Sequence, residues 1–133
     1  MRFFMVACRR ESQKTAEKAD ERYFEALEKS NYAARIPDMK AGRAWLTSTP
    51  HENVYVNATD GVTLRARLYE NKSSGTNEAA TATVVLIHGH RSSGDSDFAL
   101  TSKFIFNLGY NLLIIDQRAH GKSEGRYITF GAL

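Results

Sequence analysis

Two short apolar runs with a helix-like segment between them constrain the fold of this chain most. Residues 81–87 and 111–115 are rich in β-branched and aliphatic side chains. Residues 97–108 carry apolar side chains at three- to four-residue spacing, and Gly109 follows them, which predicts a helix with a C-terminal stop. A strand, a helix and a strand joined by short loops form a parallel pair. We expect residues 81–87 to form a central strand that is buried on both faces.

An alternating pattern precedes this unit. Apolar and polar residues alternate over residues 52–58 and again over 62–68, and Asp60-Gly61 lies between the two runs. Alternation is typical of half-buried strands, and Asp-Gly is a preferred tight-turn pair. The segment therefore predicts a β-hairpin with one wet face.

The first fifty residues have a helical pattern. Residues 15–35 repeat apolar positions every three to four residues, with Thr15 as the predicted N-cap and Ile36-Pro37 as the predicted end. A shorter helix is expected from Asp38 to Leu46, closed by Thr49-Pro50. Residues 127–133 are expected to begin one more helix.

Charge and cysteine content narrow the function classes. The net charge is +3 with a pI near 9.1, and charges of both signs are interspersed. No basic stripe interleaved with aromatic residues is present, so we expect no nucleic-acid partner. Cys8 is the single cysteine, which excludes an intrachain disulfide and favours a reducing compartment. The prediction is a cytoplasmic protein.

The N-terminus leaves an alternative to that location. The apolar stretch at residues 3–8 is shorter than a signal-peptide core and far shorter than the roughly 18 residues that span a bilayer. Basic residues follow it directly, so one interpretation is the end of a membrane anchor whose start is missing. A packed first segment is the favoured interpretation.

The strongest candidate for a functional site begins where the first apolar run ends. His88-Gly89-His90 follows residues 81–87 directly. Carboxyl ends of parallel strands are where α/β proteins bind ligands, and glycine lets the backbone turn close to one. A backbone N–H there can stabilise a developing oxyanion. A plain strand-to-helix turn explains the same residues equally well on this segment alone.

A second strand end shifts that balance. Asp116-Gln117-Arg118-Ala119-His120-Gly121-Lys122-Ser123 follows the second apolar run and resembles the D-x-R-G/A-x-G-x-S loop after the fourth strand of many α/β-hydrolases. His-Gly-x resembles the oxyanion loop of that family, and the hairpin around Asp60-Gly61 resembles its first two strands. The resemblance covers residues 52–133. It implies an α/β fold, namely the N-terminal part of an α/β-hydrolase sheet with a β-hairpin and a parallel βαβ unit, preceded by a helical extension.

The resemblance also implies roles for single residues. The backbone N–H of His90 would be an oxyanion donor, and His88 and Gly89 would shape the oxyanion loop. Asp116 and Arg118 would hold the following loop through charge-assisted hydrogen bonds. The activity implied is that of a serine esterase, lipase or peptidase acting on a small acyl substrate, with no cofactor and no metal.

Ser123 needs separate treatment because Gly121-Lys122-Ser123-Glu124-Gly125 matches G-x-S-x-G. A nucleophile elbow places its serine on a sharp turn between a strand and a helix. Here the apolar run ends at residue 115, and polar residues fill the gap. Ser123 is therefore interpreted as a loop residue. The nucleophile, acid and base are expected beyond Leu133, and no triad member is assigned.

Two other site types fail on spacing. A phosphate-binding loop ending at Gly121-Lys122-Ser123 would need a glycine where Asp116 stands. His88 and His90 suggest a metal site, but residues 91–93 add no ligand and His120 completes none.

Two hypotheses for the whole chain follow. In the first, residues 1–50 are a helical extension and residues 51–133 an incomplete hydrolase core that is inactive alone. In the second, the chain is a non-catalytic module that binds a partner or ligand through the exposed sheet edge of residues 81–87, which an unpaired apolar strand makes available. The sequence leaves the substrate and the oligomeric state open.

Overall fold

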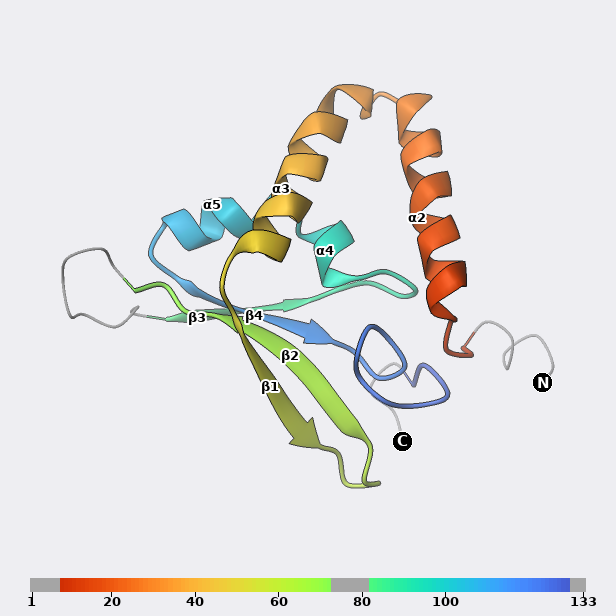
Figure 1. Ribbon diagram of the computed structural model, residues 1–133, viewed down its shortest axis with the longest axis vertical. Helices are drawn as coiled ribbons and strands as arrows, with labels where there is room; N and C mark the ends of the chain where they lie inside the picture. Colours follow the sequence, from red (N-terminus) through yellow and green to blue (C-terminus); the bar gives the residue numbers. More distant parts are fainter. Residues whose placement is uncertain (1–7, 73–81, 130–133) are drawn as a thin grey trace.

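The chain forms a four-stranded mixed sheet with helices against one face (Figure 1). The computed structural model describes residues 8–72 and 82–129. Its strands are β1 (Glu52–Asn57), β2 (Thr63–Tyr69), β3 (Thr83–Ile87) and β4 (Asn111–Asp116), in the order β1-β2-β4-β3. β1 and β2 pair antiparallel, as do β2 and β4, whereas β3 and β4 pair parallel. The predicted α/β fold, hairpin and parallel pair are confirmed.

The hairpin turn forms where Asp60-Gly61 predicts it. Ala58 N–H donates to Val62 O at 2.9 Å, and Gly61 N–H donates to Ala58 O at 2.9 Å. Gly61 has a φ of 81°, a left-handed conformation that glycine adopts at little cost. The turn lets β1 and β2 pair in register, with Val54 opposite Ala66.

The prediction that residues 81–87 form a central strand buried on both faces is wrong for the described part. β3 lies at the edge of the four strands, and its side chains alternate in exposure. Leu86 is buried under the helices, whereas Val85 and Ile87 are 50% and 59% exposed. An apolar run predicts burial on both sides of a strand, but described residues cover only one side of β3.

The N-terminal helices differ in their boundaries from the sequence prediction. α2 spans Gln13–Glu28, with Ser12 rather than Thr15 as N-cap because the Ser12 hydroxyl accepts from Thr15 N–H. A 3-10 turn, Ala33–Arg35, then leads into α3, Ile36–Ser48. Pro37 does not end a helix here. It lies in the first turn of α3, where proline is tolerated because it has no N–H to satisfy.

The connection between β3 and β4 contains two short helices, whereas the sequence predicts a single helix. It contains a single turn, α4 (Gly94–Asp97), and a short helix, α5 (Ser102–Asn107). The side chain of Ser93 caps α4 by accepting from Ser96 N–H. Gly109 follows α5 with a φ of 94°, as its stop role requires. The helix expected at residues 127–133 is absent over residues 127–129, where Tyr127 instead makes a β-bridge to Arg9; residues 130–133 lie outside the described part.

The core lies between the sheet and helices α3 and α5. Leu46, Tyr69, Leu86, Leu112 and Ile114 are its buried residues. The Tyr69 hydroxyl donates to Leu46 O at 3.1 Å, and the Trp45 ring stacks on Tyr69 with centroids 6.2 Å apart. α3 therefore packs directly on the sheet, although it belongs to the segment predicted as an extension.

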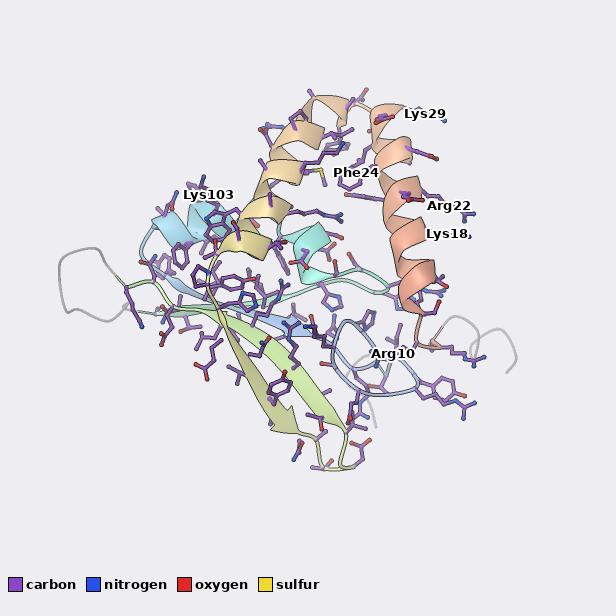
Figure 2. The ribbon with its side chains drawn as sticks, viewed as in Figure 1. Arg10, Lys18, Arg22, Phe24, Lys29 and Lys103 are labelled. Atoms are coloured by element: carbon purple, nitrogen blue, oxygen red, sulfur yellow. The ribbon has the colours of Figure 1, made fainter. Side chains whose placement is uncertain are left out.

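α2 stands beside α3 and reaches down to the loops at the end of the sheet (Figure 1). Phe24 points from α2 towards α3 (Figure 2) and receives Lys40 and Arg43 over its ring, at 5.6 and 4.9 Å from the centroid. These cation–π contacts join the two helices at a site where Phe24 and Arg43 are half-buried and Lys40 is exposed.

The opposite face of the sheet is apolar, and no helix of the described part covers it (Figure 1). The strand register places nine apolar side chains on this face, which we call the open face: Val54, Val56, Leu64, Ala66, Leu68, Val85, Ile87, Leu113 and Ile115. Val56 and Ile87 are among the most exposed, at 61% and 59%. A contiguous exposed apolar patch of this kind marks an interaction or ligand-binding surface.

No helix in the described part is both long enough and apolar enough to cross a membrane. The apolar stretch at residues 3–8, on which the anchor alternative depends, lies outside the described residues except for Cys8. Cys8 is buried against Ala119 and Ile128.

Candidate active site

Two loops meet at the carboxyl ends of the parallel strands β3 and β4. The first follows β3 and contains His88, Gly89 and His90; we call it the β3 loop (residues 88–93). The second follows β4 and runs from Gln117 to Gly125; we call it the β4 loop. Because β3 and β4 are parallel and in direct contact, both loops leave the sheet at the carboxyl ends of the strands. α/β proteins build their sites at these strand ends.

The β3 loop is held by one carboxylate. Asp97, at the end of α4, accepts the Gly89 N–H at 2.7 Å and the Ser92 hydroxyl at 2.5 Å. Ser92 N–H also donates to Gly89 O at 3.3 Å, which closes a turn across the loop. His88 is buried, whereas Gly89 and His90 are exposed. The predicted site residues thus lie in a fixed turn in which His88 is buried and Gly89 and His90 face solvent.

Backbone strain is concentrated in the same two loops. Among the described residues, the non-glycine positions with positive φ are Arg91, at 54°, and Ala119, at 63°. Such conformations cost an ordinary residue of order 1 kcal/mol and persist only where surrounding contacts enforce them. Arg91 lies in the β3 loop and Ala119 in the β4 loop. Strain of this kind is found preferentially at functional sites.

Asp116 anchors the β4 loop from the last position of β4. Its Oδ2 accepts from Arg65 Nη1 at 2.9 Å and from Lys122 N–H at 2.9 Å. The Arg65 and Asp116 side chains are each 8% exposed. Gly121, with a φ of 49°, lies directly over the carboxylate, where a Cβ atom would be 2.5 Å from the Asp116 carboxyl carbon. The loop therefore folds around a buried ion pair and requires glycine there.

Arg118 ties the β4 loop to the hairpin turn. Its two terminal nitrogens donate to the two oxygens of Asp60 at 2.8 and 2.9 Å. This bidentate hydrogen bond lowers the pKa of Asp60. The sequence predicted a holding role for Asp116 and Arg118, and both make contacts of that kind.

Ser123 is fully buried beneath the β4 loop. Its hydroxyl donates to Asp116 O at 2.5 Å and accepts the Arg65 N–H at 2.7 Å. A nucleophile elbow exposes its serine above the sheet, and the Ser123 side chain has the opposite environment. Its contacts are those of a residue that joins the β4 loop to β2.

The N-terminal segment reaches both loops, which the sequence pattern did not reveal. Arg10 donates to Ser123 O at 2.5 Å and to Gly121 O at 2.8 Å, and it lies beside the β4 loop in Figure 2. The neighbouring Glu11 forms an ion pair with Arg91 of the β3 loop at 2.6 Å. An open groove continues from this pair along α2, lined by Thr15, Lys18 and Arg22 among others. The segment before α2 thus bridges the two loops.

His120 lies in the β4 loop, and its sequence context assigns it no role. Its ring packs edge-to-face on His88, with centroids 4.7 Å apart. The only signal that pointed to it was its place in the D-x-R-A-x-G run. No group of three or more His, Cys, Asp or Glu side chains in the described part is arranged to hold a metal ion.

Comparison with known proteins gives matches to solved structures. No protein-family model matches the chain. A structure of the Pyrococcus furiosus esterase Pf2001 is similar, with 31% sequence identity and a TM-score of 0.50, over 64% of this chain and 30% of the esterase chain. A second crystal form of that esterase gives 31% identity and a TM-score of 0.50, over 64% and 31% of the two chains. The chain spans less than a third of the esterase. The fold is consistent with an α/β-hydrolase-like arrangement.

Proposed function

We propose that this chain is the N-terminal part of a serine hydrolase that cleaves an ester, amide or similar acyl bond. The observation that carries the proposal is the pairing of the β3 and β4 loops at one edge of a parallel strand pair, in a fold that matches an esterase over 64% of the chain. The substrate is a small molecule with a reactive acyl carbon.

In the proposed reaction the β3 loop supplies part of an oxyanion hole. A serine attacks the acyl carbon, and negative charge develops on the former carbonyl oxygen. Asp97 holds Gly89 N–H at 2.7 Å, and this contact orients the peptide that follows. The His90 N–H is the proposed donor to the oxyanion. A preorganised donor of this kind contributes about 3–4 kcal/mol to catalysis in comparable enzymes.

The proposal also accounts for the open face. A complete hydrolase sheet would continue beyond β3 and would be covered on both sides, so Val85 and Ile87 would be buried in the whole protein. The nucleophile, acid and base would come from that additional polypeptide. Ser123 remains a structural residue in this proposal.

A fluorophosphonate probe tests where the nucleophile lies, because it labels the reactive serine of a serine hydrolase. We expect the product of the whole gene to be labelled, with mass spectrometry placing the label outside residues 1–133. The Ser123→Ala variant should keep its labelling rate within about twofold once folded, although it loses two buried hydrogen bonds that stabilise the fold by about 1–3 kcal/mol.

Ser102→Ala is the control for removing a buried hydroxyl, since Ser102 in α5 is equally buried, although its hydroxyl has no hydrogen-bond partner among the described residues. A label on Ser123, or labelling that disappears in Ser123→Ala but not in Ser102→Ala at equal thermal stability, would contradict the proposal. A gene product that is folded and never labelled would contradict it as well.

A binding module remains the second candidate, and the exposed edge strand β3 is the observation that favours it. Size-exclusion chromatography with light scattering separates the two candidates on the 133-residue chain. A monodisperse chain that also melts cooperatively on heating supports the module. Aggregation of the 133-residue chain that the whole gene product does not show supports the hydrolase.

A further inference from the structure

The β3 and β4 loops each contribute one histidine to a reciprocal contact. His88 belongs to the β3 loop, and its Nε2 accepts the backbone N–H of Gln117 in the β4 loop at 3.3 Å. His120 belongs to the β4 loop, and its Nε2 accepts the backbone N–H of Arg91 in the β3 loop at 3.2 Å. The two rings pack against each other at 65°. Each loop is therefore held by the ring of the other.

These contacts specify the protonation of both rings. A backbone amide only donates, so each Nε2 must carry a lone pair. The Nδ1 atoms of His88 and His120 lie 2.8 Å from Gly89 O and 3.0 Å from Arg118 O, which only accept. The Nδ1–H tautomer of each ring satisfies these contacts; at His88 it leaves the Gln117 side-chain nitrogen, 3.4 Å from Nδ1, without a hydrogen bond to that atom. The side chain of Gln117 donates to His88 O and adds one further link between the loops.

We propose that His88 and His120 form a clasp that fixes the β3 loop, and that His120 is a positioning residue for the acyl-transfer reaction. The catalytic part rests on the proposed function, whereas the clasp itself does not. Arg91 is the link between the two, because its left-handed backbone and its N–H bond to His120 set the orientation of the His90–Arg91 segment. His120 acts through that segment and needs no contact with substrate.

Protonation of His120 would open the clasp. An imidazolium donates from both nitrogens, so its Nε2 cannot accept the Arg91 N–H. Burial is the largest influence and lowers the pKa of His120. The hydrogen bond to Arg118 O opposes it, His88 and His90 lower the pKa further, and Glu11 raises it. Arg91, whose backbone N–H bonds to the ring, has its charge paired with Glu11. The neutral form that the clasp needs is therefore favoured at neutral pH.

The lowered pKa of His120 determines how the stability of the clasp changes with pH. The folded protein holds a proton on His120 less tightly than the unfolded chain, whose histidine titrates near 6.5. The stabilising contribution is complete above the unfolded pKa and is lost as pH falls through the lower folded pKa. We expect the Arg91 amide to lose protection over the same interval below pH 6.5.

Nitrogen NMR of the ¹⁵N-labelled 133-residue chain tests the clasp directly. At neutral pH we expect His88 and His120 to show an unprotonated Nε2 and a protonated Nδ1. The Arg91 amide should exchange about tenfold faster in His120→Asn than in the unmodified chain, because one hydrogen bond is lost. In His120→Gln the side-chain oxygen can occupy the place of Nε2, so protection should return and its pH dependence should disappear.

His51→Gln is the control, since His51 bonds to Thr49 O away from both loops. An Nε2–H tautomer at His120 in the unmodified chain overturns the clasp, and this measurement needs no variant to fold. Unchanged Arg91 exchange in a folded His120→Asn protein also overturns it.

Kinetics of the active gene product test the positioning role. His120→Asn should lower kcat by about 10- to 100-fold with KM little changed, and His120→Gln should restore most of it. A verified clasp with unchanged kcat in His120→Asn overturns the positioning role alone. A verified clasp in a gene product without any hydrolase activity overturns the proposed function instead.

Discussion

We expect Gly42→Ala to lower the free energy of unfolding by about 2–4 kcal/mol, although alanine is the better helix former. Gly42 lies in the middle of α3, where the change would by itself gain about 1 kcal/mol of helix propensity. A Cβ atom at this position would lie 1.7 Å from the carbonyl oxygen of Ala99, however. That oxygen belongs to the backbone, so no side-chain rotation can relieve the overlap.

The clash outweighs the gain in helix propensity, so the free energy of unfolding should fall. α3 would have to move away from the segment between α4 and α5, which would loosen the packing of Leu46 against the sheet. Trp45 is the single tryptophan and stacks on Tyr69, so its fluorescence reports unfolding by urea.

Ala41→Gly in the same helix is the matched control. Ala41 is exposed, so its loss measures propensity alone, about 1 kcal/mol. A Gly42→Ala protein as stable as the unmodified one would show that α3 does not pack on Ala99 as described.

Removing the buried carboxylate of Asp116 is the second large effect. We expect Asp116→Ala to lower the free energy of unfolding by about 3–5 kcal/mol, since it leaves the Arg65 guanidinium without its charge partner in a site where both side chains are 8% exposed. The Lys122 N–H loses its acceptor in the same step. Urea denaturation at pH 7 measures the change.

Asp60→Ala is the comparison, because Asp60 forms the equivalent ion pair with Arg118 at a site where its side chain is 42% exposed. Water screens and replaces that contact, so the loss should be much smaller. Equal losses in the two variants would mean that burial does not distinguish the pairs. Asp116→Asn should fall between them, since it keeps the shape and loses the charge.

Local patterns predicted the strands of this protein well. The alternation of residues 52–68 and the Asp60-Gly61 pair placed the hairpin, because strand period and turn geometry depend on neighbours in sequence. Helix boundaries were less accurate for the same local reason. Ser12 and Thr15 are both good caps, and Pro37 is compatible with either the end of one helix or the first turn of the next.

The candidate site was predicted only as two separate strand ends. His88, Gly89 and His90 could be chosen because they follow an apolar strand, and Asp116 and Arg118 because they occupy places in a recognisable run. No sequence motif identifies Arg10, Glu11 or Asp97 as site residues. Their partners lie in other loops, so their roles depend on a register that local patterns do not encode.

The sequence by itself determined the alternation of strands and helices, the direction of the β3–β4 pair and the glycines that the turns need. These properties depend on the side chains and backbone of a few consecutive residues. Only the tertiary structure decided that β3 is half exposed, that Gly42 touches Ala99, and that the His88 and His120 rings clasp opposite loops. Those contacts join residues 29 or more positions apart, and the chain meets at such distances only after the sheet has formed.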